Sequence, residues 1–244
     1  MENQNTDYTY QNVVQIEDGE AASRKYLANV FIWMFVALGI SALTAFEFYS
    51  SGNLMSLIID PVAGGFTGLG YVAIFAPLAF SFVISFGFNR LSYIALLIIY
   101  LAYSVAIGIT FSIFGLIYTS SSIFGVFLSS ALIFGIMAIA GYKTKMDLTK
   151  MGSILYMIFI GAFVVGLVNF FMRSDQLSYI ISFVFVAVMI GLTAYYMQML
   201  KRIGAGIEYG TESSKKLVLI GAFVLYTTFI NLVMSMLRIF GRRR

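Results

Sequence analysis

The chain has 244 residues, of which 60% are hydrophobic and only 11% are charged, and its mean hydropathy is +0.92. Such a composition is too apolar for the surface of a water-soluble fold, so the bilayer must be the solvent of this protein. The chain contains no cysteine and no histidine, which excludes disulfides, thiolate nucleophiles, imidazole bases and the usual zinc and haem ligand sets. The net charge of +4 lies mainly beside the apolar segments, which indicates membrane topology rather than a nucleic-acid partner.

Seven long apolar runs account for most of the sequence. They cover residues 28–48, 69–88, 91–118, 122–142, 151–172, 177–200 and 217–240. Each run has at least 20 residues, enough helix at 1.5 Å per residue to cross a hydrocarbon core of about 30 Å. The runs are continuous rather than alternating, which favours helices over a β-barrel. We therefore predict an all-α, polytopic membrane protein with seven transmembrane helices.

The two ends of the chain differ in composition from the apolar part. The N-terminal segment is rich in Asn, Gln, Thr and acidic residues, a composition that buries little surface. We predict three parts: a mobile polar tail at residues 1–27, a membrane domain at 28–241 and a basic tail at 242–244. Most of the loops are short, so successive helices are expected to be antiparallel neighbours.

Basic residues set the expected orientation. With a cytoplasmic N-terminus, the inside loops hold ten basic residues and the outside loops hold only Arg173. The inside residues are Arg24, Lys25, Arg90, Lys143, Lys145, Lys150, Lys201, Arg202, Lys215 and Lys216. The tail at 242–244 would then lie outside, against the same rule, so the last run either crosses fully or re-enters. We expect it to cross, because its 24 residues suffice. The short loops favour a bacterial inner membrane.

Few polar side chains lie inside the apolar runs. Glu47 is the only carboxylate there, and it either reaches the interface at the outer end of the first span or contributes to an ion path. Three amides are costly in lipid and are expected to face the bundle interior and to bond across helices: Asn169, Gln198 and Asn231. Small residues recur every four positions in the third run, where close helix packing is favoured over a pore lining: Ser104, Gly108 and Ser112.

The segment after the fourth run carries the most specific pattern in the chain. It reads Gly141-Tyr142-Lys143-Thr144-Lys145-Met146-Asp147-Leu148-Thr149-Lys150-Met151-Gly152. This pattern resembles the Bax-inhibitor family of seven-helix membrane proteins, also called the transmembrane Bax inhibitor motif family. Later segments fit the same family: Leu167-Val168-Asn169-Phe170-Phe171, Gly191-Leu192-Thr193-Ala194-Tyr195, Leu225-Tyr226 and Phe229-Ile230-Asn231-Leu232. The resemblance extends from about residue 24 to residue 241.

The resemblance implies six helices around a central seventh. It also implies a function, since the family includes pH-sensitive calcium leaks and, in bacteria, a modulator of a membrane-bound ATP-dependent protease. In the leaks, two facing aspartates on the sixth and seventh helices form a proton-sensing pair. Here Tyr196 and Thr228 occupy those two positions. A tyrosine ordinarily has a pKa of about 10 and a threonine does not titrate, so this pair cannot sense protons near neutrality. Its two hydroxyl groups can still hydrogen-bond to each other.

We predict a non-enzymatic ion leak, with calcium as the expected ion and with little or no pH sensitivity. Calcium prefers six to eight oxygen ligands, so its binding is expected to be weak in spans that hold a single acid. The candidate gate or ion path comprises Tyr196, Thr228, Glu47, Asn231 and Asn169. No cofactor is expected, and the expected partners are the lipid bilayer and calcium ions. The alternative is a regulatory protein that binds and modulates a membrane-bound quality-control protease, which the missing acid pair and the polar tail favour.

Overall fold

The structure is a computed structural model that describes residues 5–60, 65–87, 90–207 and 210–244. Eight helices lie within these residues: α1 (Asn5–Ser50), α2 (Gly52–Ser56), α3 (Gly68–Gly87), α4 (Tyr93–Ile117), α5 (Ser120–Lys143), α6 (Thr149–Met172), α7 (Asp175–Ala205) and α8 (Glu212–Phe240). All of them except the short α2 are long and apolar enough to cross a membrane. Each of the seven apolar runs coincides with one of these helices, which confirms an all-α, polytopic membrane protein.

Polar side chains determine where several helices begin. Ser92, Ser174 and Thr211 precede α4, α7 and α8, and each side chain accepts a hydrogen bond from a backbone amide of the first turn. Such N-caps satisfy amides that have no carbonyl partner within the helix. Because its first turn is capped and polar, α8 begins at Glu212, before the apolar run that we expected from residue 217.

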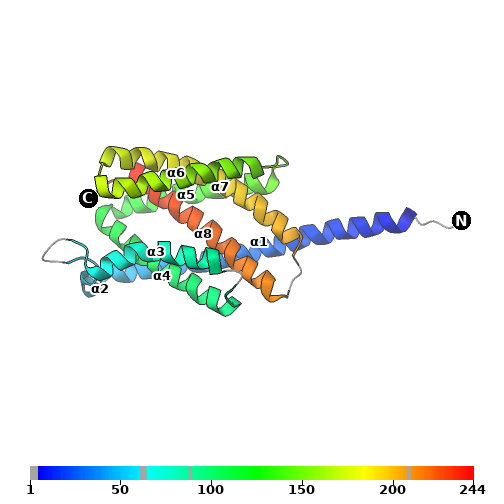
Figure 1. Ribbon diagram of the computed structural model, residues 1–244, viewed down its shortest axis with the longest axis horizontal. Helices are drawn as coiled ribbons and strands as arrows, with labels where there is room; N and C mark the ends of the chain where they lie inside the picture. Colours follow the sequence, from blue (N-terminus) through cyan, green and yellow to red (C-terminus); the bar gives the residue numbers. More distant parts are fainter. Residues whose placement is uncertain (1–4, 61–64, 88–89, 208–209) are drawn as a thin grey trace.

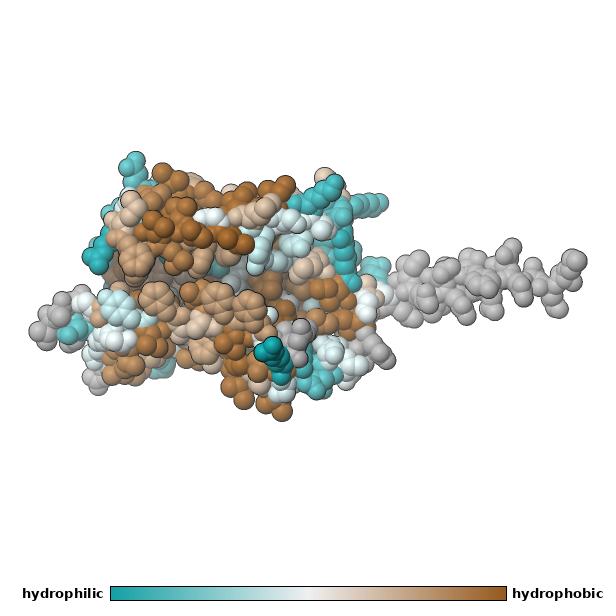
Figure 2. All heavy atoms as spheres, viewed as in Figure 1, coloured by the Kyte–Doolittle hydropathy of each residue, from teal (hydrophilic) through white to brown (hydrophobic). Residues whose placement is uncertain are grey.

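The last helix, α8, forms the centre of the bundle. In Figure 1 it passes between a layer of α5, α6 and α7 and a layer that contains α3 and α4. It packs against α1, α4, α5 and α7. Of its most apolar stretch 67% is buried, against 11% for α3 and 6% for α6, so those two helices are peripheral. Figure 2 shows hydrophobic side chains spread over this face of the bundle and hydrophilic ones gathered toward its ends.

The small residues of α4 let α1 approach closely. A Cβ atom on Gly108 would lie 2.6 Å from Thr44 Cβ and 2.7 Å from Ser41 O, so only glycine fits there. Ser41 Oγ lies 2.7 Å from Ser104 O, and its hydroxyl is also hydrogen-bonded to the Tyr226 hydroxyl of α8. The stripe is therefore buried at a junction of three helices, which confirms the packing interpretation.

The packed bundle begins earlier in the chain than the apolar run does. Helix α1 is continuous from Asn5, and both Ser23 and Tyr26 are only 1% exposed. The Ser23 hydroxyl donates to Lys201 O and the Tyr26 hydroxyl donates to Leu217 O, each at 3.0 Å. The packed bundle therefore includes residues that precede position 28, the expected start of the membrane domain, because hydroxyl groups can be buried once they are hydrogen-bonded. Mobility of the preceding residues stays a prediction.

The final helix runs the full length of the bundle beside α4. At one end Tyr93 N donates to Glu212 Oε1 at 3.2 Å, and at the other Thr119 N donates to Arg242 O at 3.0 Å. Arg244 also donates from Nη2 to the Tyr49 hydroxyl at the end of α1, at 2.9 Å. The last apolar run therefore crosses rather than re-enters. A cytoplasmic N-terminus stays a prediction, and it would place the C-terminus outside.

Candidate functional site

The α5–α6 loop, which carries most of the family pattern, is fastened to α7 by side chains. Gln198 accepts a hydrogen bond from Leu148 N at 2.9 Å and donates to Met146 O at 2.7 Å. Lys201 donates to Tyr142 O at 3.0 Å, with its ammonium group 4.4 Å from the Tyr142 ring centroid. Gln198 thus binds across elements, as expected for a buried amide in a membrane bundle.

The glycines of this pattern permit the close contact with α7. A Cβ on Gly141 would overlap the backbone of Ala194, and one on Gly152 would overlap the ring of Tyr195. Thr144 caps the end of α5 and accepts from Met146 N at 3.2 Å. The three lysines of the pattern are exposed: Lys143, Lys145 and Lys150. The family loop pattern therefore forms a structural junction.

Asp147 also contributes to this junction between the α5–α6 loop and α7. Its Oδ1 accepts from Thr149 Oγ1 at 2.6 Å, from Thr149 N at 3.1 Å and from Arg202 Nη2 at 2.9 Å. Hydrogen bonds from Thr149 and then from Arg202 lower the pKa of the Asp147 carboxyl group to about 2. The carboxylate is therefore ionised across the physiological pH range and does not act as a proton switch.

The two positions that correspond to the family's acid pair are not hydrogen-bonded to each other. The Thr228 hydroxyl donates to Val224 O of its own helix at 2.7 Å. The Tyr196 ring packs against Tyr195, with 5.3 Å between the ring centroids. Among the described residues, no hydrogen bond joins Tyr196 to Thr228, so the direct bond that we considered possible is not formed.

Glu47 lies apart from these positions, near the end of α1. Its side chain is exposed, and it does not line the cavity described below. The exposure favours the interfacial interpretation of this carboxylate over a place on an ion path.

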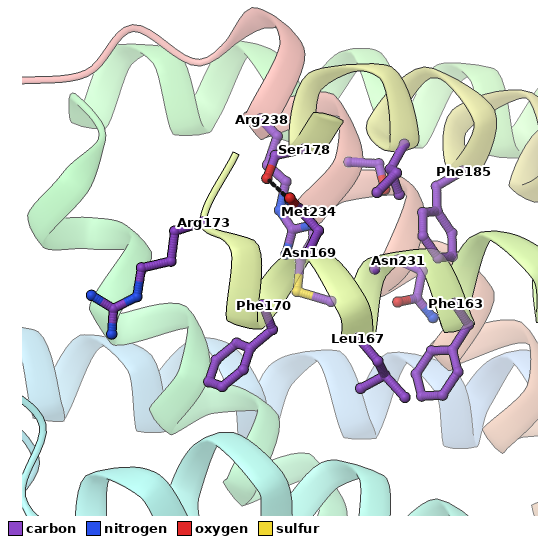
Figure 3. Close-up of a pocket in the computed structure, with 13 residues that line it drawn as sticks. Phe163, Leu167, Asn169, Phe170, Arg173, Ser178, Phe185, Asn231, Met234 and Arg238 are labelled. Carbon is purple, nitrogen blue, oxygen red and sulfur yellow. Dashed lines mark hydrogen bonds between the residues drawn. The ribbon is translucent and has the colours of Figure 1, made fainter. Parts of the chain in front are cut away.

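A cavity of about 440 Å³ opens between α6, α7 and α8 (Figure 3). Its lining comprises Phe163, Gly166, Leu167, Asn169, Phe170, Arg173, Ser178, Ile181, Phe185, Asn231, Met234, Ser235 and Arg238. Arg238 lies near the end of α8 and Asn231 two turns earlier, so the cavity extends roughly 10 Å along the helix toward the bundle centre. Two of the expected site residues, Asn169 and Asn231, are thus brought together in one cavity.

The amides of the cavity are held by bonds near their own positions. Asn169 donates from Nδ2 to Ser178 Oγ at 2.6 Å and to Ser174 O at 3.1 Å, and its Oδ1 accepts from Ser174 N at 3.1 Å. These bonds fix the turn between α6 and α7. Asn231 donates to Thr227 O of its own helix at 2.9 Å. The expectation that Asn231 bonds across helices is wrong. Its carboxamide donates to a backbone carbonyl of its own helix, α8, and lines the cavity.

Two arginines of the cavity were missed as site residues in the sequence. We assigned Arg173 to an outer loop, and Arg238 lies near the end of the last apolar run, where a charge ordinarily reflects topology. In Figure 3 the Arg238 side chain reaches into the cavity behind Asn169, whereas Arg173 points away at the cavity's outer end. No aspartate or glutamate belongs to the lining, so the described cavity is electropositive.

Aromatic rings lie at the inner end of the cavity. Phe163 and Phe185 line it, and both rings contact Phe159 one turn deeper on α6, with centroid distances of 6.4 and 5.7 Å. Tyr156 continues this column, 6.1 Å from Phe159. We call Phe159, Phe163 and Phe185 the aromatic seal. Neither Tyr196 nor Thr228 lines the cavity, so it ends before the level of the family's acid pair.

The described residues contain no group of three or more His, Cys, Asp or Glu side chains that could hold a metal ion. The oxygen atoms available in the cavity come from amides, hydroxyl groups and carbonyls. Such a lining can contact a passing hydrated ion, but it does not resemble a tight calcium site.

Comparison with known proteins identifies the family. The chain matches the family model described as inhibitor of apoptosis-promoting Bax1 over residues 23–244. The chain belongs to this Bax-inhibitor family. It is 37% identical over 227 residues to the inner membrane protein YbhL of Escherichia coli, a match that covers 92% of this chain and 94% of YbhL.

Two further relatives match over a similar length. A protein of Rickettsia prowazekii is 34% identical over 221 residues, covering 91% of each chain. A protein of Borreliella burgdorferi is 34% identical over 221 residues, covering 90% of this chain and 93% of its own. The protein is thus an integral membrane member of the Bax-inhibitor family, similar along its whole bundle to bacterial proteins.

The junction at Asp147 yields a pH prediction for this family member. Asp147→Asn removes the ion pair with Arg202 and is expected to lower the thermal midpoint of the purified protein by a few degrees at most, because the pair is exposed. The pKa of the Asp147 carboxyl group is lowered from the ordinary 3.8 to about 2 in the folded protein, so its ionised form stabilises the fold at pH values above 3.8. This stabilisation is lost as the pH falls toward the pKa of the folded protein. The difference between wild type and variant is therefore expected to stay constant from about pH 5 to 8 and to shrink below about pH 4.

The matched control is Glu47→Gln, which removes an exposed carboxylate that lies outside the junction. Its midpoint is expected to equal that of the wild type. A difference for Asp147→Asn that grows or vanishes between about pH 5 and 8 would contradict the assignment of this carboxylate.

Proposed function

We propose that this protein is a slow, gated ion leak of a bacterial inner membrane, with calcium as the expected ion. One observation carries the proposal: a cavity lined by amides, hydroxyl groups and arginines enters the bundle from one end and stops at a layer of aromatic rings. A polar entrance followed by a narrow apolar barrier is the arrangement of a gated pathway.

The aromatic seal supplies a physical gate. Rings packed together exclude water, and an ion that loses its hydration shell beside apolar surface is strongly disfavoured. Rotation of the Phe163 or Phe185 side chain would widen this layer without a change in the helix backbone. Weak contacts with amide and hydroxyl oxygens suit passage rather than retention, because a tight site would hold the ion.

The gate has no proton sensor of the kind found in the family's leaks. Two carboxylates in contact resist double ionisation, so one of them titrates near neutrality and can switch a conformation. Tyr196 and Thr228 stand at those positions and lack that chemistry. Flux is therefore proposed to depend on the packing of the aromatic seal, with little dependence on pH.

Calcium flux into vesicles that contain the purified protein tests this proposal. Wild-type flux is expected to vary by less than about twofold from pH 6 to 8, because no coupled acid pair is present. The double variant Tyr196→Asp with Thr228→Asp restores both acids and is expected to make flux change by roughly tenfold over the same range. The single variant Thr228→Asp is the control and should respond less.

Two outcomes would contradict the proposal in different ways. Absence of flux at every pH would remove the leak. A steep response of the wild type near neutral pH would leave the leak but remove the proposed gate.

One observation favours a second candidate, a modulator of a membrane-bound quality-control protease. Helix α1 extends beyond the bundle at its N-terminal end (Figure 1), where it offers a surface outside the membrane domain. We propose that a partner protein would bind there. Deletion of residues 1–18 leaves Ser23 and Tyr26 in place, so the bundle is expected to fold.

The same deletion distinguishes the two candidates. A leak should keep its flux after the deletion, whereas a regulator should lose a protease that co-purifies with the full chain. Loss of flux together with an intact thermal midpoint would contradict the assignment of the pathway to the α6–α7–α8 cavity.

A further inference from the structure

Arg238 has no counter-charge among the described residues of the membrane domain. Its side chain reaches into the α6–α7–α8 cavity, and none of the hydrogen bonds or ion pairs described in the chain involves its guanidinium group. The neighbouring Asn169 side chain is already engaged with Ser174 and Ser178. The residue is exposed near the end of α8, so an anionic group from outside the chain can reach its guanidinium group and supply a counter-charge.

The cavity is also amphipathic along its length. Arg173 and Arg238 lie at its outer part, and aromatic and aliphatic side chains form its inner part: Phe163, Leu167, Phe170, Phe185 and Met234. At about 30 Å³ per water molecule, its volume corresponds to roughly 15 waters, which is more than a small inorganic anion fills. A ligand with an anionic head and an apolar chain would match both parts.

The wall formed by α6 lets such a ligand enter from the lipid. Leu167 and Phe170 line the cavity and are nevertheless 42% and 53% exposed, so this side of the cavity borders the surface that faces the hydrocarbon. Helix α6 is also the least buried of the spanning helices. An acyl chain could therefore lie in the cavity while the rest of the lipid stays in the bilayer.

Arg173 is placed for the head group by an unusual backbone conformation. It ends α6 in the left-handed region with φ of 53°, and its amide donates to Asn169 O at 2.7 Å. This region ordinarily favours glycine or asparagine. The turn places Arg173 at one end of the cavity, with its side chain pointing away from the other labelled residues (Figure 3). We expect this end to face the lipid head groups, because Arg173 directly follows the spanning helix α6.

We propose that the α6–α7–α8 cavity binds one anionic phospholipid from the adjacent leaflet. Its phosphate group binds Arg238, the exposed side chain of Arg173 turns toward the same phosphate, and one acyl chain lies along Phe163 and Leu167. A guanidinium fork matches two oxygen atoms of a phosphate, which makes arginine better suited to this role than lysine. The lipid supplies a counter-charge that Arg238 does not find among the described residues.

The bound lipid has a consequence for the ion pathway, and this step rests on the proposed function. Two arginines without a counter-charge repel calcium from the cavity entrance. A phosphate group between them lowers that positive potential, so cations can enter the polar part of the cavity. The anionic lipid content of the membrane would then set the rate of the leak.

Native mass spectrometry of the purified full chain tests the binding site directly. Phosphatidylglycerol is expected to be retained at one copy per chain and roughly tenfold more strongly than phosphatidylcholine with the same acyl chains. The double variant Arg238→Met with Arg173→Gly is expected to retain the two lipids equally. Arg238→Lys keeps the charge without the fork and should retain an intermediate amount of phosphatidylglycerol.

Two controls keep this test informative. Arg243→Gln removes a basic residue at the same end of the bundle that does not line the cavity, and its lipid retention should match the wild type. Glycine readily adopts the left-handed backbone conformation of residue 173, so Arg173→Gly is expected to remove a guanidinium group without loss of the fold. This single variant therefore suffices for the test if the double variant does not fold. It is expected to weaken phosphatidylglycerol retention several-fold.

The outcomes distinguish a lipid site from a site for a free anion, and they distinguish the lipid site from the leak. Equal retention of both lipids by the wild type overturns the proposal. Displacement of phosphatidylglycerol by excess inorganic phosphate overturns it as well, because the site would then recognise a free anion. Selective lipid binding without calcium flux removes the leak and keeps this site, whereas flux without selective binding removes the site and keeps the leak.

Discussion

A polar group inside a bilayer has no water to pair with, so it must find its partner within the protein or at the surface. This constraint organises the whole bundle. Around the central α8, the hydroxyl groups of Ser41 and Tyr226 are bonded to each other, and Gln198 uses both ends of its amide to bind the α5–α6 loop. Asn169 does the same for the turn between α6 and α7. The helices are held in register where these groups are satisfied.

The α6–α7–α8 cavity contains a charged side chain that does not follow this rule. Arg238 carries a charge into the space between α6, α7 and α8, and no described hydrogen bond or ion pair balances it. Arg238 is exposed at the cavity and has no hydrogen-bond or ion-pair partner among the described residues, so its guanidinium group is open to a ligand. The proposed lipid site and the proposed pathway thus share one origin, a polar cavity that packing of the bundle leaves open and that aromatic rings close at its inner end.

Much of the fold follows from the sequence by simple rules. Continuous apolar runs predicted the seven spans, and the four-residue spacing of Ser104 and Gly108 predicted close packing of another helix on α4, because both signals are local. The structure shows that this helix is α1. The start of the bundle was less accessible, since Ser23 and Tyr26 are buried only through hydrogen bonds to carbonyls of α7 and α8. Hydrogen bonds from side chains to distant segments produce no periodic pattern in a sequence, so the sequence does not predict them.

The candidate site was only partly predictable for the same reason. Asn169 and Asn231 were identified because amides are rare in apolar runs, and both line the cavity. Arg238 was not identified, because a charge near the end of an apolar run ordinarily reflects topology. The aromatic seal could not be predicted, because Phe159 and Phe185 belong to different helices and meet only in the packed bundle. The family loop pattern proved to be a structural junction, so family membership describes the scaffold more closely than it describes the pathway.

We propose that the cavity ends at the aromatic seal and, with the expected cytoplasmic N-terminus, opens to the outer side of the membrane. Cysteine accessibility tests this claim most directly. The chain contains no cysteine, so a single introduced cysteine is a unique reporter. A membrane-impermeant thiol reagent applied from outside is expected to modify Met234→Cys, inside the cavity, at least roughly tenfold faster than Thr228→Cys, beyond its lining. Equal rates at the two positions, or modification of Met234→Cys only from the cytoplasmic side, would contradict this claim.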